Sequence, residues 1–303
     1  DLDARANQPL RVDDDWIVFN GELYNYVERR AALDRPGRQF RTRSDTEVML
    51  ASLRDQGWES LDSCEGMWAF GVYSERDGSL TLCRDRFGEK PLVYYWDGKT
   101  FAFASELKAL ARFHSSQLNP EAVRAYTELG YIPAPLAIFR NCHKLPPGHL
   151  LRFRDGVHVE RWFHPEVGQP SGDTLSAQVQ RATSLRLAPD AALALSGGVD
   201  SSVLAWELRE SGIPAISVRV EGAVNEIPAA SAVAQWCRLP HHIAELRSED
   251  VPDLFERAVE LYDEPFADSS SLPSLVLART AAQSHRILIT GEGGDECFGG
   301  YRH

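Results

Sequence analysis

Apolar runs of strand length alternate with segments of helical spacing in the second half of the chain. The runs are residues 191–195, 215–220, 242–246 and 286–290, and the helical segments are residues 201–210, 229–237, 253–262 and 274–284. Strands that alternate with helices in this order are typical of a parallel sheet with helices on its faces. The pattern therefore predicts a parallel-sheet α/β fold for this half of the chain.

The first half has a different pattern, with short β-rich runs separated by turns and one helical stretch at residues 45–56. Residues 66–73 are most simply a strand of a sandwich core. The segment 119–164 favours irregular structure because it is rich in proline, with Pro133, Pro135, Pro146 and Pro147 among its residues. We therefore predict a β-rich domain at residues 1–160, which ends in a proline-rich connector, and an α/β domain at residues 173–303.

The apolar run that ends at Leu195 leads directly into a glycine- and serine-rich loop. Gly197 and Gly198 let the backbone approach a ligand, and the helix that follows supplies free N–H groups at its start. Three hydroxyl groups add further donors for an anion, those of Ser196, Ser201 and Ser202. Asp200 would repel a phosphate unless a divalent cation lay between them, so it indicates Mg²⁺. The alternative interpretation is a tight turn in an ordinary α/β unit.

Three carboxylates follow the last predicted strand. Glu292, Asp295 and Glu296 lie among the glycines of the segment Gly291-Glu-Gly-Gly-Asp-Glu-Cys-Phe-Gly-Gly-Tyr301. In open α/β sheets ligands bind at the carboxyl ends of the strands, so these acids are placed to surround a metal ion and a phosphate ester. The alternative is a solvated acidic turn.

In the first half, an apolar run that starts at Trp16 leads into Asn20-Gly21-Glu22. We interpret Asn20-Gly21 as a turn dipeptide whose side-chain amide and backbone N–H both donate to an oxyanion. A plain hairpin turn is the alternative. From spacing alone, Glu22 and Asp45 are equally consistent with solvated surface acids.

Together these segments resemble the class B, glutamine-dependent asparagine synthetases, a family that also includes the β-lactam and carbapenam synthetases. The loop after Leu195 resembles the pyrophosphate loop of the ATP pyrophosphatases, and residues 262–271 resemble the family's segment between the two loops. The first-half motifs, among them Cys83-Arg-Asp-Arg-Phe-Gly-Glu-Lys-Pro-Leu92, are similar in order to the glutaminase domain of N-terminal-nucleophile amidotransferases. The resemblance covers nearly the whole chain and implies a layered β-sandwich followed by an ATP pyrophosphatase domain.

The resemblance also implies roles for individual residues. In the glutaminase domain, Asn20 and Gly21 would form the oxyanion hole, and Glu22 and Asp45 would hold the α-amino group of glutamine. In the synthetase domain, ATP and its pyrophosphate would be held by Ser196, Gly197, Gly198, Asp200, Ser201, Ser202 and Gly291. Asp200 and Asp295 would bind Mg²⁺, and Glu292 would act as the base for ammonia. Val218 is a weaker candidate for adenine contact, and a core valine is the alternative.

The implied reaction activates the side-chain carboxylate of aspartate with ATP as an acyl-adenylate, which ammonia from glutamine then converts to asparagine. One alternative is a related ATP-dependent amide ligase that acts on another carboxylate, such as a β-lactam former or an amidotransferase of a peptide or cell-surface precursor. Another is a non-catalytic relative that binds nucleotide or a partner, against which the intact Asp200, Asp295 and Glu292 argue. Glu292 favours asparagine over the β-lactam formers.

The sequence departs from the family pattern at both ends. The family's nucleophile is a cysteine at the mature N-terminus, whereas this chain begins with Asp1, and the family's catalytic lysine lies in a helical region after the metal loop. We therefore expect an internal fragment that lacks glutaminase activity as it stands. Neither Cys64 nor Cys83 is a replacement nucleophile, because a cysteine in mid-chain lacks the α-amino base.

Composition and charge argue against several other classes of protein. The formal net charge of −12 argues against a nucleic-acid surface, and no apolar run approaches the length of a membrane span. The five cysteines have neither paired nor zinc-ligand spacing, as expected in a reducing cytosol. His241 and His242 point to opposite faces of a predicted strand, which argues against one shared metal ion. We expect a cytoplasmic enzyme whose partners are small molecules, with a homodimer as one possible assembly.

Overall fold

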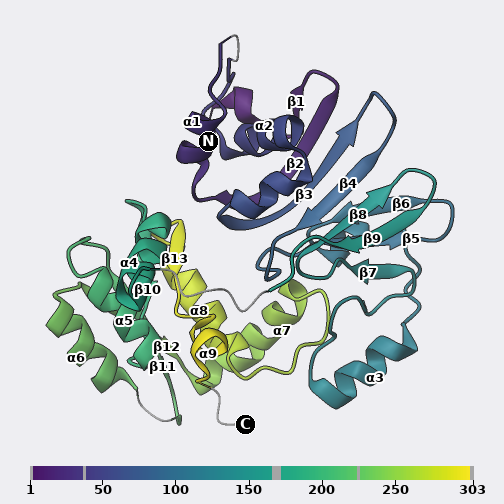
Figure 1. Ribbon diagram of the computed structural model, residues 1–303. Coiled ribbons are helices and arrows are strands. Elements are labelled where there is room, and N and C mark those ends of the chain that lie inside the picture. The colour runs from purple at the N-terminus through teal and green to yellow at the C-terminus, as the bar shows by residue number, and fades with distance from the viewer. Residues whose placement is uncertain (1–2, 37–38, 166–171, 224–225, 301–303) are drawn as a thin grey trace. The chain divides into compact units, whose positions relative to one another are not determined.

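The structure, a computed structural model, describes residues 3–36, 39–165, 172–223 and 226–300, and it divides into two compact units (Figure 1). The first unit contains Asp1–Gly168 together with Asp263–Phe266, and the second contains Gln169–Tyr262 and Ala267–His303. The expectation of a fragment rests on the two ends of the chain. Asp1 and residues 301–303 lie outside the described residues.

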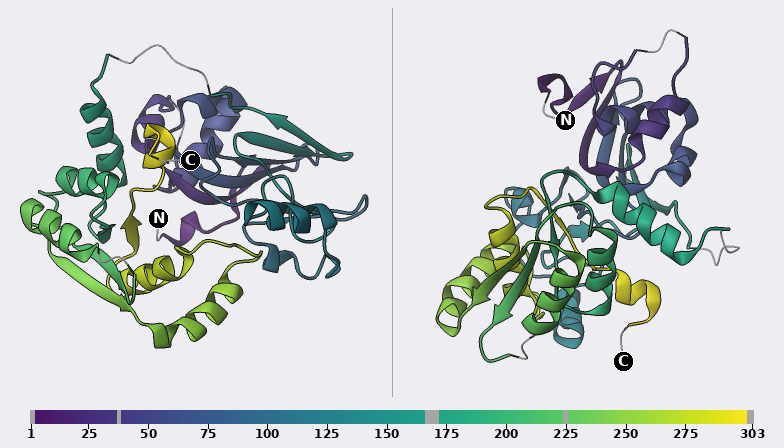
Figure 2. Two further views of the ribbon diagram at one scale, coloured as in Figure 1. Left: turned by 90° about the horizontal axis from the view of Figure 1, so that it is seen from below. Right: turned by 90° about the vertical axis from the view of Figure 1, so that its left-hand side faces the viewer.

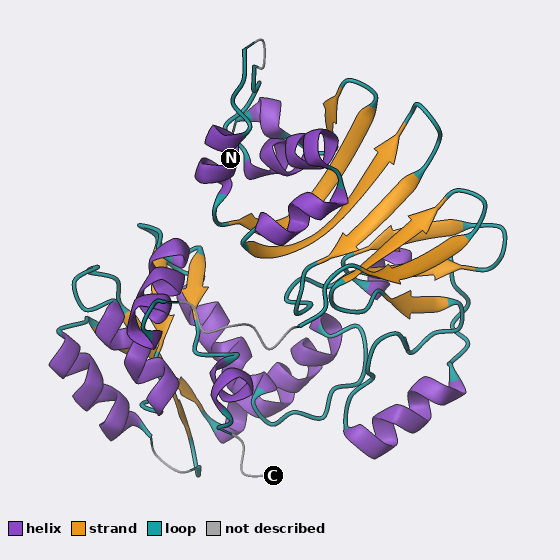
Figure 3. Ribbon diagram, viewed as in Figure 1, coloured by secondary structure: helices purple, strands orange, loops and turns teal. Residues whose placement is uncertain are grey.

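Two antiparallel sheets form the centre of the first unit (Figure 3). The larger sheet has the order β1-β2-β3-β4-β8-β9, with strands at Leu10–Val12, Asp15–Leu23, Gly66–Ser74, Leu80–Arg84, His149–Phe153 and Val157–Arg161. The smaller sheet has the order β6-β5-β7, with strands at Phe101–Ala104, Val93–Trp96 and Cys142–Lys144. Antiparallel strands of this length need only short connections, which agrees with the frequent turns in this half of the sequence.

The alternation of side chains along the strands builds four layers. On the larger sheet, Ile17 and Phe70 pack with residues of helix α2 (Asp45–Gln56), which lies against this face (Figure 2). The opposite face packs on the smaller sheet through residues such as Leu82 and Tyr94. The outer face of the smaller sheet is covered by helix α3 (Pro120–Leu129) and the short 3-10 helix Leu107–Leu110. Helix α1 (Tyr26–Ala32) packs beside α2. The layered β-sandwich with flanking helices is therefore confirmed.

Two local predictions for this unit are wrong. Asn20 and Gly21 do not form a turn, because they lie inside β2, opposite Ala69 and Trp68 of β3. A Cβ atom on Gly21 would overlap the carbonyl oxygen of Met67, so the glycine serves the close approach of two strands. The segment 119–164 is not an irregular connector either, since it contains α3 and the strands β7, β8 and β9.

The second unit is built on a four-stranded parallel sheet of order β12-β11-β10-β13. The strands are β10 (Ala191–Ala194), β11 (Ala215–Val220), β12 (His241–Leu246) and β13 (Ile287–Ile289). The helices are α4 (Leu175–Arg186), α5 (Val199–Glu207), α6 (Ile227–Cys237), α7 (Val251–Leu261), α8 (Ser271–Ala281) and α9 (Gly294–Phe298). The predicted parallel α/β fold is confirmed, with element ends that differ from the predicted ones by a few residues.

Helices cover both faces of this sheet. Leu193 and Ala215 pack on one face with Ala205 of α5 and Ala234 of α6. On the other face, Ala192 and Ile216 pack with residues of α8, among them Leu277 and Ala281. Burial on both faces explains why β10 and the first half of β11 are continuous apolar runs in the sequence. Within the described ranges, no helix is long and apolar enough to cross a membrane.

Candidate functional site

In the second unit, the topology brings the two glycine-rich loops together. Strands β10 and β13 are parallel neighbours, with Ala191 opposite Ile287 and Leu193 opposite Ile289. Parallel neighbours end at the same edge of a sheet, so the loop after β10 and the loop after β13 leave from adjacent points. Residues that are about 90 positions apart in the sequence therefore meet at one sheet edge.

The first loop, Leu195–Gly198, connects β10 directly to α5. Hydrogen bonds inside it hold its shape: Ser196 Oγ lies 3.0 Å from Ser201 Oγ and accepts from the N–H of Gly198 at 3.2 Å. Ser202 Oγ donates to the carbonyl oxygen of Gly198 at 2.6 Å. Gly198 is the N-cap and its residue type supplies no side-chain acceptor, so the first N–H groups of α5 have no partners from the helix itself. Such a helix start favours a bound anion.

The second loop packs directly on the start of α5. A Cβ atom on Gly291 would lie 3.2 Å from both the Cβ of Asp200 and the N of Ser201. A Cβ on Gly294 would lie only 2.6 Å from Cγ of Asp200. The two glycines thus touch Asp200, and Glu292, which is exposed, lies between them in the sequence. Asp295 follows Gly294 in the first turn of α9.

The acidic residues at this edge include two candidate ligands of a metal ion, Asp200 and Asp295. No group of three or more His, Cys, Asp or Glu side chains is placed to hold a metal ion anywhere in the described part of the chain. Asp200 and Asp295 provide two carboxylates at most, and a phosphate ligand and water would have to complete the coordination of a Mg²⁺ ion there. This number of protein ligands is usual for Mg²⁺ that binds together with a nucleotide.

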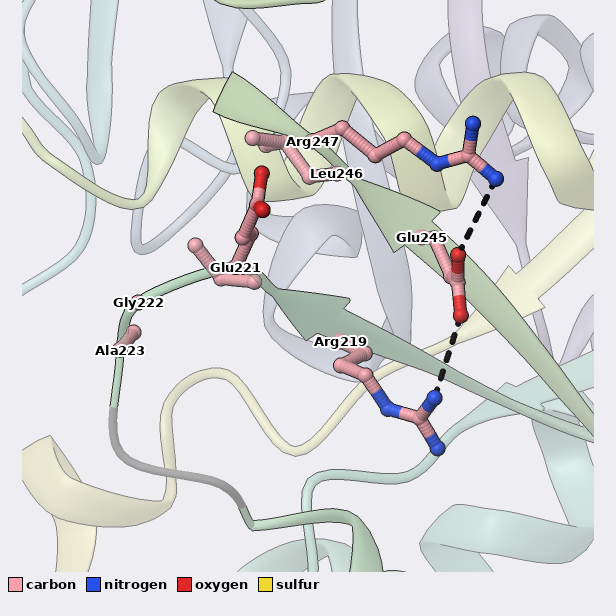
Figure 4. A pocket seen from close by; sticks show the side chains of 8 residues that line it. Arg219, Glu221, Gly222, Ala223, Glu245, Leu246 and Arg247 are labelled. Carbon is pink, nitrogen blue, oxygen red and sulfur yellow. Dashed lines mark hydrogen bonds and ion pairs between the residues drawn. The ribbon is translucent and has the colours of Figure 1, made fainter. Parts of the chain in front are cut away.

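Val218 lies in the carboxyl-terminal half of β11, opposite Ala244 of β12, and is half-buried. Beyond it, the ends of β11 and β12 border a pocket of about 380 Å³. Figure 4 shows Glu245 between the guanidinium groups of Arg219 and Arg247, with N–O distances of 3.1 and 3.5 Å. Among the described residues, the lining consists of 219–223 and 245–247, so Val218 does not line this pocket.

In the first unit, the alternation along β2 puts Asn20 and Glu22 on the face of the larger sheet that packs on the smaller sheet, where both are exposed. The amide Nδ2 of Asn20 donates to Ser105 Oγ at 3.2 Å, and Ser105 directly follows β6. The two sheets therefore meet here through polar side chains, whereas apolar side chains fill the space further along.

Glu22 and Asp45 form an acidic pair at the end of β2. Asp45 begins α2, and its Oδ2 accepts from the N–H of Leu23 at 3.0 Å while its Oδ1 accepts from the N–H of Thr46 at 2.8 Å. Desolvation raises the pKa of Glu22, and the negative charge of Asp45 raises it further. An acidic pair of this kind is suited to hold a cationic group such as an ammonium.

Two known protein families match the chain in the order of its two units. The family described as "Glutamine amidotransferase domain" matches residues 1–163, and the one described as "Asparagine synthase" matches residues 173–303. The chain belongs to the glutamine-hydrolysing asparagine synthetase family.

Curated relatives are similar to this asparagine synthetase family member along nearly its whole length. The putative glutamine-hydrolyzing asparagine synthetase 2 of Methanocaldococcus jannaschii is 32% identical over 336 residues, which cover 99% of this chain and 65% of that protein. The glutamine-hydrolyzing asparagine synthetase 1 of Bacillus subtilis is 32% identical over 312 residues, which cover 98% of this chain and 49% of that protein. The chain thus spans about half to two thirds of the length of these relatives.

A solved structure of the glutamine phosphoribosylpyrophosphate amidotransferase of B. subtilis aligns with 78% of this chain and 48% of its own. The TM-score is 0.36 at 21% identity.

Sequence reasoning about this family member missed two contacts of the site. Ser105 was not singled out, although its hydroxyl accepts from Asn20, because nothing in the sequence indicates which strand end lies beside β2. Gly294 was treated only as part of a glycine-rich loop, although it is the point of contact with Asp200. The run of paired glycines in residues 291–300 was the available signal, since a close approach of two backbones requires residues without a Cβ.

Proposed function

We propose that the full-length protein makes asparagine from aspartate, glutamine and ATP. The side-chain carboxylate of aspartate attacks the α-phosphorus of ATP, pyrophosphate leaves, and an aspartyl-adenylate forms. Ammonia released from glutamine then attacks the activated carbonyl carbon, and AMP leaves with one of the former carboxylate oxygens. The products are asparagine, glutamate, AMP and pyrophosphate.

The observation that supports this proposal is the meeting of the two loops at Asp200. A loop with free N–H groups at a helix start suits the phosphates of ATP, and Gly291 and Gly294 bring a second loop against it. The two together supply an anion cradle and three carboxylates, Asp200, Glu292 and Asp295, at one sheet edge. An ordinary tight turn needs none of these acids.

The residues have separate tasks under this proposal. The backbone of Ser196–Ser202 and of Gly291 holds the pyrophosphate portion of ATP, because phosphate oxygens accept from several N–H groups there. Val218, on the neighbouring strand, is the candidate for contact with adenine. Glu292 takes a proton from the attacking ammonia, since its exposed carboxylate lies in the loop that packs on Asp200.

Asp200 and Asp295 are the proposed magnesium ligands. Their carboxylate oxygens are the type of ligand that Mg²⁺ prefers, and Gly294, without a Cβ, lets the start of α9 approach the carboxylate of Asp200 closely. When bound, the ion would neutralise negative charge on the phosphate oxygens of ATP.

In the first unit, the proposal assigns glutamine to the acidic pair. Glu22 and Asp45 hold its α-amino group, and the donors for the oxyanion are the Asn20 amide and the backbone N–H of Gly21. The proposal also places the protein in the cytoplasm, which cell fractionation would test. It further includes assembly into a homodimer, which sedimentation of the purified protein would test.

The exchange of labelled pyrophosphate into ATP tests the proposed function. The full-length protein should catalyse this exchange when aspartate is present and not without it. The variant Glu292→Gln should retain the exchange and lose asparagine formation, because it adenylates aspartate but removes the base. An undiminished rate of asparagine formation by this variant would refute the role of Glu292. An exchange rate that is the same with and without aspartate would refute aspartate as the substrate.

A further inference from the structure

A chain of hydrogen bonds runs beneath the phosphate loop in the second unit. Ser217 of β11 is 3% exposed, and its Oγ donates to the carbonyl oxygen of Leu195 at 2.5 Å. The same Oγ lies 2.7 Å from Nε2 of His241 on β12. Nδ1 of His241 lies 3.4 Å from Ser231 Oγ on α6. Strands β11 and β12 and helix α6 are thus linked to Leu195, the first residue of the loop.

The chemistry of these groups fixes the direction of each bond. A carbonyl oxygen can only accept, so the hydroxyl proton of Ser217 is committed to Leu195. Ser217 Oγ can then only accept from the imidazole, which means that Nε2 of His241 carries the proton. In the neutral ring Nδ1 is then an acceptor, and Ser231 donates to it. The arrangement therefore selects the Nε2–H tautomer of His241.

The same elements also touch the loop from its other side. A Cβ on Gly197 would lie 2.7 Å from the backbone N of Ala230 and 3.0 Å from the Cβ of Ala229, both on α6. Ala230 directly precedes Ser231, so α6 contacts the loop at Gly197 and His241 at Ser231. Leu195 is held by β11 and Gly197 is held by α6, and both of these elements contact the imidazole of His241. A change at His241 is therefore transmitted to both points of the loop.

Burial also favours the neutral ring. Desolvation lowers the pKa of His241, with a smaller contribution from the neighbouring His242. His242 is exposed and points to the opposite face of β12, in keeping with the alternation of a strand. The two adjacent histidines thus have different surroundings, and only His241 has contacts that lead to the loop.

We propose that His241 is a positioning residue for the phosphate loop, which it holds in its binding shape through Ser217 and Ser231. This inference rests on the proposed function, because it assumes that the loop binds the phosphates of ATP. His241 does not touch the substrate in this role. Its effect is on the position of the Leu195 carbonyl and of Gly197, and hence on the affinity for ATP and pyrophosphate.

The variant His241→Leu, which removes both hydrogen bonds, should raise the KM for ATP about tenfold in pyrophosphate exchange, the effect of roughly one net hydrogen bond. The KM for aspartate should stay within about twofold. His241→Gln keeps an N–H near the position of Nε2 and should bring the KM for ATP back to within about threefold of the wild-type value. His242→Leu is the matched control and should leave both constants unchanged. Equal KM values for ATP in the wild type and His241→Leu would overturn the inference.

A measurement on the wild-type protein guards against variants that fail to fold. The ¹⁵N shifts of the His241 ring should be those of a neutral Nε2–H tautomer at neutral pH, and Ser217→Ala should change them. An Nδ1–H tautomer would overturn the inference. Calorimetry with Mg²⁺ and inorganic pyrophosphate distinguishes failure of the proposed function from failure of this inference. Absence of binding by the wild type refutes the proposed function. Binding by the wild type that His241→Leu and Ser217→Ala leave unchanged refutes only the role of His241.

Discussion

Gly294 lies so close to Asp200 that a Cβ atom at position 294 would be 2.6 Å from Cγ of the aspartate. A larger residue at position 294 would meet the side chain of Asp200, so either the carboxylate must leave its present position or the two loops must move apart. Gly294→Ala should therefore weaken the binding of ATP with Mg²⁺ by about tenfold, which corresponds to about 1.4 kcal/mol. Isothermal titration calorimetry would measure this change.

Gly172→Ala is the matched control in the same unit, because a Cβ there meets nothing within 4 Å and the backbone is not left-handed. Its affinity for ATP should equal that of the wild type. If the two alanine variants bind ATP equally well, the contact between the loops has no part in nucleotide binding.

The proposed metal ligands lead to a second prediction. Replacing Asp200 or Asp295 by Asn removes a negative oxygen from the ion but keeps the size of the side chain. Pyrophosphate exchange by the full-length protein should fall by about a hundredfold or more in either variant, while the KM for aspartate changes little. Exchange near the wild-type rate in Asp295→Asn would show that this residue is not a ligand.

The third prediction concerns the titration of Glu22. Desolvation and the charge of Asp45 raise its pKa in the folded chain, so the folded state binds this proton more tightly than the unfolded chain does. Glu22 should therefore favour folding increasingly as the pH falls through its raised pKa towards the ordinary value for glutamate. Asp45→Asn removes the second cause and should lower the pKa of Glu22.

Carbon-13 NMR titration of the Glu22 carboxyl group checks this prediction, with Asp77→Asn, in the turn between β3 and β4, as the control. Titration of Glu22 in the ordinary glutamate range would contradict it, as would a pKa that Asp45→Asn leaves in place.

The fourth prediction concerns Asp85, which is 1% exposed and organises the loop after β4. Its Oδ1 accepts from the N–H groups of Phe87, Gly88 and Glu89, and its Oδ2 accepts from those of Lys90 and Trp68. An asparagine at this position would turn an NH₂ group towards buried donors. Asp85→Asn should therefore reduce the free energy of unfolding by about 3 kcal/mol, as measured by urea denaturation.

Asp77→Asn serves as the control here too. Asp77 is exposed, and its Oδ1 accepts from Ser79, which an asparagine oxygen can replace. Its Oδ2 lies 4.0 Å from Arg154 in an exposed ion pair, which contributes little to stability. Its change in unfolding free energy should stay within about 0.5 kcal/mol. Equal stabilities of the two variants would mean that the five contacts of Asp85 contribute little.

The sequence predicts the second unit better than the first for a physical reason. Strands β10, β11 and β13 are covered by helices on both sides, so each contributes an apolar run that stands out from its flanking segments. The loops that follow parallel strands all leave from the same edge of the sheet. This is why the meeting of residues near Asp200 and Gly291 at one edge could be expected before the fold was known.

The errors in the first unit come from signals that are local in sequence. Asn20-Gly21 is a strong turn dipeptide, yet β2 continues through it because β3 pairs along its whole length, up to Leu23 opposite Gly66. Pro133 and Pro135 lie between elements and precede β7, and Pro146 and Pro147 likewise precede β8. Pro120 is the first residue of α3, a position that suits proline in a helix. Pairing between strands that are far apart in the sequence determines the structure at Asn20-Gly21 and in the segment 119–164. Such pairing cannot be read from a single sequence.

The most direct test of the account follows the oxygen atoms of aspartate. The full-length protein would be incubated with ATP, glutamine and aspartate labelled with ¹⁸O in the side-chain carboxylate, and the products would be analysed by mass spectrometry. Attack of the carboxylate on the α-phosphorus, followed by displacement by ammonia, predicts one ¹⁸O atom in AMP and one in the amide of asparagine. AMP without the label, or label in inorganic phosphate released together with ADP, would contradict the account.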